Sequence, residues 1–293
     1  VSPAQAGEPE RYELSRPARI GVQYEFTQYL DGGPWLKTRA QLEQSLGKKN
    51  LDFMVLESPM LQNAVKAGAV DLAVTDAGNF IPFEMTGQLI GLLSLWPVQT
   101  PDPSFADGVL FVKRAASTEI RTLADMRNRL IGASYPTSFG GWLIGLREFQ
   151  RQKLNAEVIT NNTRFYGTDP ANILRALRQE KVDLAILHTC AFESLAKRGE
   201  ITPADYDFLD LREVDFSSCR HSGELYPSFI ISAFEGTDQA MSRAAMASLQ
   251  NMTGAATGVD WGPVASTRAV HDLYYALKVG PYEHLQVFRL STF

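Results

Sequence analysis

The stretch VKAGAVDLAVT at residues 65–75 decides the fold, because it has a counterpart, LRQEKVDLAIL, at residues 177–187. Each copy ends a helical pattern, passes through a short turn and continues as VDLA into an apolar run. Apolar runs that alternate with helical patterns predict parallel strands joined by crossover helices. One copy in each half of the chain therefore predicts two similar α/β lobes.

The segments around each copy continue the alternation of apolar runs and helical patterns. In the first half we predict strands over 18–23, 51–56 and 70–75 and helices over 37–46, 58–68 and 79–86. In the second half we predict strands over 109–113, 130–134, 163–166, 182–187 and 225–234 and helices over 123–128, 141–154, 170–178, 191–198, 240–253 and 266–277. Asp71 and Asp183, which enter strands after turns, are expected to be structural.

Length and composition indicate an ordered protein with more than one core. The chain has 293 residues, 45% of them hydrophobic and 21% charged, which suits two lobes of ~100–150 residues each. The net charge of −5 without a basic run argues against nucleic acids and anionic membranes as partners. No apolar stretch reaches the ~20 residues that span a bilayer. The N-terminus has no basic or apolar signal region, so we expect any signal peptide to be removed already.

Polar, small and aromatic residues follow the predicted strands. Ligands bind beyond the carboxyl ends of parallel strands, and a few placed polar groups beside aromatic walls are typical of a pocket. We therefore expect a ligand site among the residues after the strands, at 23–25, 75–79, 134–142, 166–169 and 188–190.

The segment TSFGG at residues 137–141 is the sharpest of these signals, because it stands directly before a predicted amphipathic helix. Free amides and the helix dipole at such a position favour an anion. A plain N-cap, in which Ser or Thr satisfies the start of the helix, explains the same residues. Both interpretations stay open at this point.

Signs of catalysis or metal binding are weak. His188, His221, His271 and His284 do not have the spacing of zinc ligands, and no nucleotide-binding glycine motif or nucleophile elbow is present. A nucleophile–base pair of Cys190 with His188 or of Cys219 with His221 lacks an evident orienting carboxylate. We expect a binding protein without catalytic residues, cofactor or metal.

Cys190 and Cys219 are the two cysteines. They form one bridge in an oxidising compartment, or they are two unrelated buried thiols. Counting alone does not decide between these alternatives.

Several motifs follow one another along the chain: VDLAVTDAGNF (70–80), GVLFVK (108–113), LADM (123–126), SFGGW (138–142), FYGT (165–168) and ELYP (224–227). In this order they resemble the phosphonate-binding group of type II periplasmic binding proteins. The resemblance covers about residues 17–277.

Around the cysteines and in the tail the chain reads TCAFE (189–193), CRHSGELYP (219–227) and LKVGPYE (277–283). Within that group, these segments resemble the periplasmic sensor domains of tetrathionate-sensor-type histidine kinases. His188 stands where an Arg is common, and Gly223 replaces the usual Thr. An Arg exchanged for His would hold a doubly charged anion less firmly, so the ligand need not be tetrathionate.

The resemblance implies a two-lobed α/β fold whose lobes, each a mostly parallel sheet flanked by helices, are joined by two hinge strands near 109–113 and 219–226. Lobe 1 would comprise 17–112 and 222–280, and lobe 2 would comprise 113–221, with terminal extensions at 1–16 and 281–293. The ligand-binding residues implied on the lobe-1 side are Tyr24, Thr75, Asp76 and Asn79, with Tyr226 in the return hinge. Those implied on the lobe-2 side are Ser138, Phe139, Gly140, Thr168 and His188.

The resemblance also implies a function. We expect a periplasmic sensor domain of a two-component histidine kinase that closes on a small anion, such as an oxidised sulfur compound, phosphate or a phosphonate. It would be anchored by a helix after this chain and, as a sensor, could form a homodimer. The alternative is a free substrate-binding protein that delivers its ligand to an ABC permease. In either case a bridge between Cys190 and Cys219 would restrain the hinge, whereas free thiols could exchange with an oxidised sulfur compound.

Overall fold

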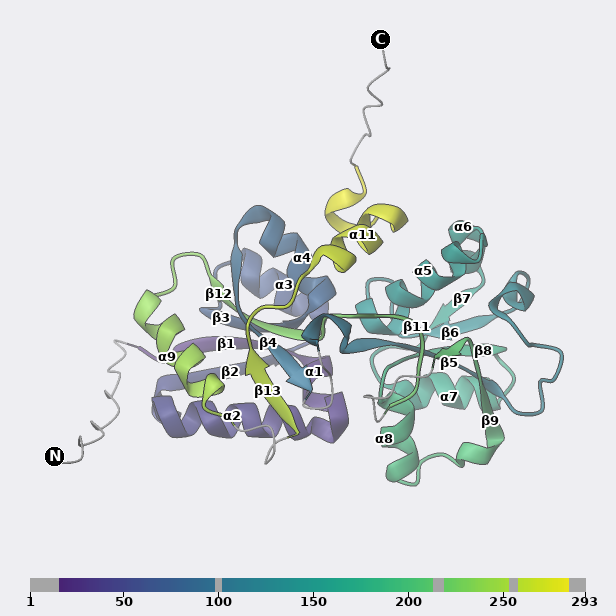
Figure 1. Ribbon diagram of the computed structural model, residues 1–293, viewed down its shortest axis with the longest axis horizontal. Coiled ribbons are helices and arrows are strands. Elements are labelled where there is room, and N and C mark those ends of the chain that lie inside the picture. Colours follow the sequence, from purple (N-terminus) through teal and green to yellow (C-terminus); the bar gives the residue numbers. More distant parts are fainter. Residues whose placement is uncertain (1–15, 98–101, 213–218, 253–257, 285–293) are drawn as a thin grey trace, which may run out of the picture.

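The computed structural model of the protein describes residues 16–97, 102–212, 219–252 and 258–284. These residues form two sheets that lie beside each other, each covered by helices (Figure 1). Lobe 1 denotes the sheet that contains the N-terminal strand, with its helices, and lobe 2 denotes the other sheet with its helices. The prediction of two α/β lobes is therefore confirmed.

Lobe 1 is built around parallel pairs of β1 with β2 and of β1 with β3. Two later strands, β12 and β13, return to the same sheet and run antiparallel to their neighbours. The order across the sheet is β13-β4-β12-β3-β1-β2. Its strands are β1 (Ala18–Gln23), β2 (Leu51–Leu56), β3 (Leu72–Asp76), β4 (Leu89–Pro97), β12 (Phe229–Phe234) and β13 (Val259–Gly262). Its helices are α1 (Tyr24–Gln28), α2 (Gly33–Leu46), α3 (Ser58–Lys66), α4 (Ala77–Thr86) and α9 (Gln239–Gln250), with short turns η1 (Tyr29–Gly32) and η2 (Lys48–Asn50).

Lobe 2 repeats the arrangement with β6 parallel to both β7 and β8. The order is β10-β11-β5-β8-β6-β7, and β9 also pairs with β5. Its strands are β5 (Asp107–Arg114), β6 (Ile131–Ala133), β7 (Thr163–Phe165), β8 (Leu184–His188), β9 (Tyr206–Leu209), β10 (Leu211–Arg212) and β11 (His221–Tyr226). Its helices are α5 (Ile144–Arg151), α6 (Ala156–Asn161), α7 (Pro170–Arg178) and α8 (Ala191–Lys197), with the π-helix η5 (Phe139–Leu143) directly before α5 and short turns η4 (Leu123–Met126) and η6 (Pro203–Asp205).

The aspartates of the repeated VDLA motif hold equivalent places in the two lobes. Asp71 accepts a hydrogen bond of 2.8 Å from the backbone N–H of Arg19, at the start of β1. Asp183 accepts one of 3.0 Å from the N–H of Leu130, directly before β6. Each aspartate therefore ties the strand that it precedes to the start of the parallel neighbour. This explains why the motif occurs once in each lobe.

Two predicted elements differ clearly from the structure, and some of the observed strands were not predicted. The predicted strand 225–234 is wrong, because it is divided at Pro227 into β11 of lobe 2 and β12 of lobe 1. Proline has no N–H to donate to a ladder, so it interrupts the strand where the chain crosses between sheets. The predicted helix 123–128 is only the turn η4. The apolar run that became β4 was not assigned to a strand.

The chain crosses from lobe 1 to lobe 2 between β4 and β5, near the turn η3 (Pro103–Phe105), and returns between β11 and β12. The lobe limit predicted at residues 112 and 113 falls inside β5, which pairs wholly within the sheet of lobe 2. The crossings therefore lie beside, rather than within, the strand segments predicted as hinges.

The C-terminal helix α11 (Arg268–Leu277) lies above the junction of the two lobes (Figure 1). His271 on this helix is 3.1 Å from a carboxylate oxygen of Glu84 on α4 of lobe 1. The backbone carbonyl of Ala276 accepts a hydrogen bond of 3.0 Å from Gln150 on α5 of lobe 2. The helix, with the turn η7 (Gly280–Tyr282) after it, therefore contacts both lobes.

Among the described residues, no helix is both long enough and apolar enough to cross a membrane.

The two VDLA aspartates should differ in their contribution to stability. Asp71 is buried and paired with Arg16 and Arg19 at 2.7 and 2.9 Å, and these partners hold the pKa of Asp71 well below its usual range although burial opposes them. Asp71→Asn should lower the free energy of unfolding by about 1–3 kcal/mol, measured by urea denaturation. Asp183, whose arginine contacts are 3.8 and 3.9 Å, is the matched control. An equal loss in Asp183→Asn would contradict this assignment.

Candidate functional site

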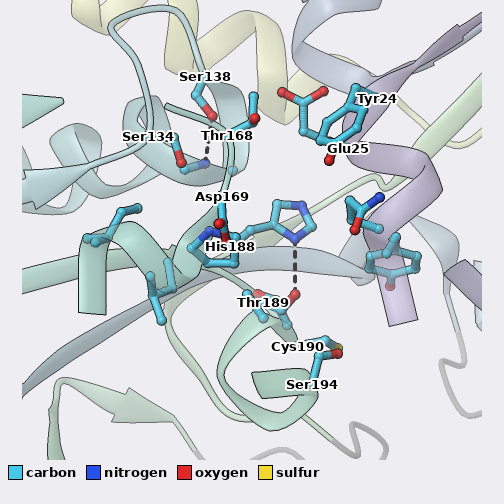
Figure 2. A pocket seen from close by; sticks show the side chains of 18 of the residues that line it. Tyr24, Glu25, Ser134, Ser138, Thr168, Asp169, His188, Thr189, Cys190 and Ser194 are labelled. Carbon is cyan, nitrogen blue, oxygen red and sulfur yellow. Dashed lines mark hydrogen bonds between the residues drawn. The ribbon is translucent and has the colours of Figure 1, made fainter. Parts of the chain in front are cut away.

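A cavity of about 420 Å³ lies between the lobes. It is lined by residues at the ends of β1, β3, β6 and β8 or directly after them, as expected where the carboxyl ends of parallel strands meet. Figure 2 shows Tyr24 and Glu25 on one side and Ser134, Ser138 and Thr168 on the other. Hydroxyl, carboxylate and imidazole groups from both lobes thus face one enclosed space, which is the arrangement of a solute-binding cleft.

Six of the ten residues predicted to contact a ligand line this cavity: Tyr24, Asp76, Ser138, Gly140, Thr168 and His188. Cys190 lines it as well. The other four predicted residues, Thr75, Asn79, Phe139 and Tyr226, are buried beside the cavity and are not in its wall.

Phe139 and Tyr226 are not in the wall because they pack against each other in the core, with ring centroids 5.7 Å apart. Phe139 also fills the space above Gly78 of lobe 1, where an added Cβ atom would lie 2.5 Å from the ring. The two residues therefore join the lobes behind the cavity.

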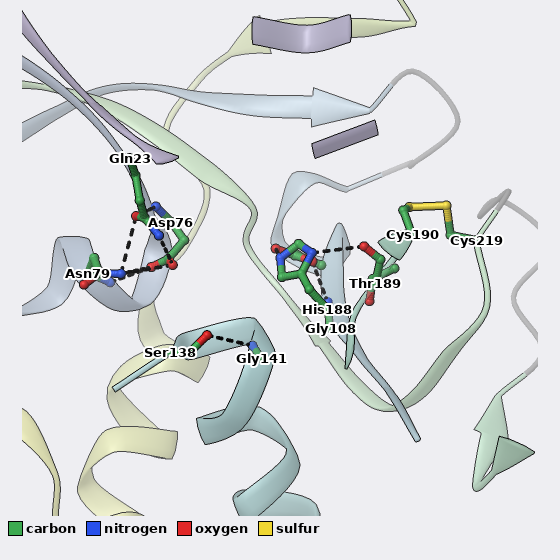
Figure 3. Close-up of polar contacts among 11 residues, drawn as sticks. Gln23, Asp76, Asn79, Gly108, Ser138, Gly141, His188, Thr189, Cys190 and Cys219 are labelled. Carbon is green, nitrogen blue, oxygen red and sulfur yellow. Dashed lines mark hydrogen bonds and ion pairs between the residues drawn. A yellow bond between two sulfur atoms is a disulfide. The ribbon is translucent and has the colours of Figure 1, made fainter. Parts of the chain in front are cut away.

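Asn79 supports the wall indirectly by holding Asp76 in place (Figure 3). The Asn79 backbone N–H donates to the Asp76 carboxylate at 2.7 Å, as at a helix N-cap, and the Asn79 side chain donates to both of its oxygens at 3.0 Å. Gln23 adds a further donor at 2.7 Å. Burial nevertheless raises the pKa of Asp76 to about 6, against these hydrogen bonds.

His188 is held as a fixed positive charge. Its Nε2 is 2.8 Å from a carboxylate oxygen of Asp107, which is fully buried, and its Nδ1 is 3.0 Å from the carbonyl oxygen of Thr189. Burial disfavours the charged ring, but the Asp107 carboxylate and these hydrogen bonds outweigh it and raise the pKa of His188 to about 9. Since both nitrogens have partners, His188 contributes charge and shape to the cavity rather than a free hydrogen-bond donor.

Gly140 is required by the position of His188. A Cβ atom at residue 140 would lie 2.1 Å from Cδ2 of the imidazole. Ser138 accepts a hydrogen bond of 3.1 Å from the N–H of Gly141 and so caps the helix that η5 and α5 form together. The capping interpretation of TSFGG is therefore correct, and the first turn of that helix still faces the cavity through Gly140 and Gly141.

Tyr135 bridges the lobes at Glu25, which lines the cavity. This lobe-2 side chain donates to Oε1 of Glu25 at 2.5 Å, and its hydroxyl is 2.9 Å from Ser58 Oγ, both in lobe 1. Burial, with the nearby charges of Glu25 and Asp76, raises the pKa of Tyr135 far above its usual value. A second bridge joins Asp31 of lobe 1 to Lys197 and Arg198 of lobe 2, at 3.1 Å each. These contacts require the two lobes to be close together.

Cys190 and Cys219 are joined in a disulfide, with Cα atoms 5.0 Å apart (Figure 3). The bond links the turn after β8, in the cavity wall, to the segment that leads into β11 and the return crossing. Of the alternatives that the sequence left open, the structure contains the bridge.

Tyr135, Asp107 and Asp31 were missed as functional candidates. Tyr135 lies within the polar segment after β6, which the strand-end argument marked, but nothing local distinguishes it from its neighbours. Asp107 and Asp31 act through partners that are 81 and 166 or 167 residues away in sequence, and single-sequence patterns contain no signal for such pairs. The described residues contain no cluster of three or more His, Cys, Asp or Glu side chains suited to a metal ion.

Comparison with known proteins agrees with this geometry. Residues 34–261 match the family model for the ABC transporter phosphonate periplasmic substrate-binding protein. The tetrathionate sensor histidine kinase TtrS of Salmonella typhimurium is 26% identical over 251 residues, which are 85% of this chain and 42% of the kinase. The chain therefore spans about two fifths of the length of this relative.

Solved structures share the fold at low sequence identity. PhnD1 from Prochlorococcus marinus, in complex with methylphosphonate, has a TM-score of 0.66 and 11% identity, over 90% of this chain and 98% of that one. A histidine kinase sensor domain with similarity to periplasmic binding proteins has a TM-score of 0.53 and 15% identity, over 88% and 95% of the two chains. The predicted type II periplasmic-binding-protein fold is confirmed.

The charge on His188 should depend on Asp107. In the wild-type protein the pair contributes its full stability below pH 6.5, the ordinary pKa of histidine, and this contribution is lost as the pH rises through about 9. In Asp107→Asn the burial of the ring remains without the carboxylate, so the pKa of His188 should fall to 6.5 or below. Titration of the ring protons by NMR measures both values. An unchanged titration would contradict the assigned pair.

The hydroxyl of Tyr135 should hold the lobes together. Tyr135→Phe leaves the bonded oxygen of Glu25 and the hydroxyl of Ser58 without this partner, which costs about 1–2 kcal/mol only when the lobes are close. The ligand-free variant should therefore be more open, with a larger radius of gyration in small-angle X-ray scattering. Tyr275→Phe, at an exposed tyrosine, is the control. Identical scattering from both variants would show that the Tyr135 hydroxyl does not hold the lobes together.

Proposed function

Because the chain belongs to the ABC transporter phosphonate periplasmic substrate-binding protein family, we propose that it binds a small solute with an anionic group between its lobes. We further propose that it acts as the extracytoplasmic sensor domain of a two-component histidine kinase. Closure of the lobes on the solute would be the signal. The anionic group would be an oxidised sulfur group, a phosphate or a phosphonate.

The observation that carries the proposal is the start of a helix at the cavity. The helix that begins at Phe139 starts at the lobe-2 wall, where Gly140 and Gly141 line the cavity. Amides in the first turn of a helix lack intrahelical partners and carry the positive end of its dipole. Together with the hydroxyls of Ser134, Ser138 and Thr168 and the charge of His188, they favour an anionic group there.

The contacts of α11 support a signalling role. A sensor must transmit the angle between its lobes, and α11 contacts α4 of lobe 1 and α5 of lobe 2. Any change in lobe angle must strain or move this helix, which precedes the C-terminal residues. A ligand drives such a change only through greater affinity for the closed state. The similarity to the tetrathionate sensor kinase supports the same role.

A second candidate function is that of a free periplasmic substrate-binding protein for an ABC transporter. The family model and the likeness to a methylphosphonate-bound relative favour it. The two roles share the binding step and differ in what receives the closed form. Sequencing the native gene beyond Phe293 separates them: a membrane helix and kinase module support the sensor, and a stop codon supports the transporter protein.

The anion site is tested with Ser138→Ala combined with Thr168→Ala. Loss of two hydroxyls that face the anionic group should weaken binding at least about tenfold. Calorimetric titration with tetrathionate and with methylphosphonate measures it. The fold should persist, since loss of the Ser138 cap costs about 1 kcal/mol. Thr137→Ala, next to Ser138 but outside the cavity wall, is the control. A double variant with wild-type affinity for a probe that binds would remove these hydroxyls from the site.

A further inference from the structure

A second cavity, of about 560 Å³, lies beside the C-terminal helix α11, which Figure 1 shows near α4 at the junction of the lobes. Its wall comes from α3 and α4 of lobe 1, from residues 136–143 of lobe 2, and from the segment between Tyr274 and Glu283. None of the described residues lines both cavities. The second cavity is therefore a separate space, and a molecule in it would contact both lobes and the C-terminal segment.

The wall of the second cavity is mainly apolar. Each of its three parts contributes apolar side chains, namely Pro82 and Phe83 of α4, Leu143 of η5, and Val279 and Pro281 of the C-terminal segment. A cavity of this size, lined by hydrophobic and aromatic side chains with few polar groups, is typical of a site for a small molecule. An apolar ring or chain placed there would be removed from water, which favours binding.

One buried polar group of this wall lacks a partner. Tyr274 is 6% exposed, and its ring lies 6.3 Å from that of Phe139 between centroids. Its hydroxyl forms no hydrogen bond with a described residue. Burial, with the charge of Asp76, raises the pKa of Tyr274 far above its usual value, so the hydroxyl keeps its proton and can donate it. An acceptor on a ligand would supply the missing partner.

The other buried polar side chain of the wall is already bonded within the protein. Asn79, which is 4% exposed, accepts a hydrogen bond of 2.8 Å from Gln62 and donates to Asp76. Thr86, on the exposed part of the wall, donates to the carbonyl oxygen of Pro82. Tyr274 is therefore the buried side chain of this wall that has a donor to offer a ligand.

The charged side chains of the wall do not require a charged ligand. They are Lys66, Lys278 and Glu283, and all three are exposed. Lys66 stands in the last turn of α3 and Lys278 directly after α11, where a cation offsets the negative end of the helix dipole. Among the described residues, no buried charge lines the second cavity. An uncharged molecule therefore fits this wall best.

We propose that the second cavity binds a small, uncharged molecule with an apolar body and a carbonyl-type oxygen that accepts the hydrogen bond of Tyr274. This site is distinct from the interlobe cavity and does not rest on the proposed function. Because both lobes and the C-terminal segment form its wall, its occupant holds these three parts together.

Prodan, an uncharged naphthalene with one ketone group, is a suitable probe, because its emission moves to longer wavelength when the ketone accepts a hydrogen bond. The wild-type protein should bind it saturably at one site in a fluorescence titration. Tyr274→Phe keeps the ring and removes the donor, so it should weaken binding about fivefold and shift the bound emission to shorter wavelength. Its stability to urea should not fall, since the lost hydroxyl had no partner. Tyr275→Phe, at the exposed neighbour, should behave like the wild type.

A second pair of variants tests the place of binding without Tyr274. Thr86→Trp adds a large side chain to the wall of the second cavity and should weaken Prodan binding at least about tenfold. Thr160→Trp is the control, because Thr160 is also exposed, also donates to the carbonyl four residues before it, and lines neither cavity. Weaker binding in Tyr274→Phe or Thr86→Trp than in its control supports the site. Absence of saturable binding to the wild type, or equal binding within both pairs, overturns it.

Discussion

Parallel pairing of β1 with β3 and of β6 with β8 is the constraint on which the rest of the structure depends. In each lobe an aspartate of the repeated VDLA motif fixes the start of one strand against the other. Because paired parallel strands end at the same edge, the segments that follow them are brought together at that edge. The two edges face each other, and the cavity is the space that remains between them.

The polar groups of the cavity are held in place mainly by the protein itself. His188 uses both ring nitrogens, and Asp76 uses both carboxylate oxygens, in bonds to neighbouring residues. A ligand therefore meets oriented charges and dipoles that need little rearrangement, which lowers the ordering cost of binding. One buried carboxylate oxygen of the wall, Oε2 of Glu25, has no hydrogen-bond partner among the described residues.

The contacts between the lobes differ in chemistry with their position. Behind the cavity they are apolar, as where the ring of Phe139 covers Gly78. Across the cavity they are polar, as in the bond from Tyr135 to Glu25 and the pairs of Asp31 with Lys197 and Arg198. Polar groups regain water when they separate, whereas separated apolar surfaces lose favourable burial. The lobes should therefore open at the polar side and stay joined at the apolar side, which is a hinge motion.

Local periodicity in the sequence determined where several strands lie and that the chain forms two lobes. The predicted ranges 18–23 and 51–56 coincide with β1 and β2, and the repeated VDLA motif correctly indicated two lobes. The rule that ligands bind after parallel strands then placed Tyr24, Ser138, Thr168 and His188 in the cavity wall. Phe139, which the same rule marked, and Tyr226, which the family resemblance implied, pack in the core instead. Neither signal distinguishes a side chain that faces the cavity from one that faces the core.

Only the tertiary structure decided which distant groups meet. Asp107 pairs with His188 across 81 residues, and Tyr135 bonds Glu25 across 110 residues. The disulfide between Cys190 and Cys219 and the division of the predicted strand at Pro227 likewise depend on how the chain returns from one lobe to the other. A periodic pattern reflects which face of its own helix or strand is buried, and it carries no information about partners that folding brings from elsewhere in the chain.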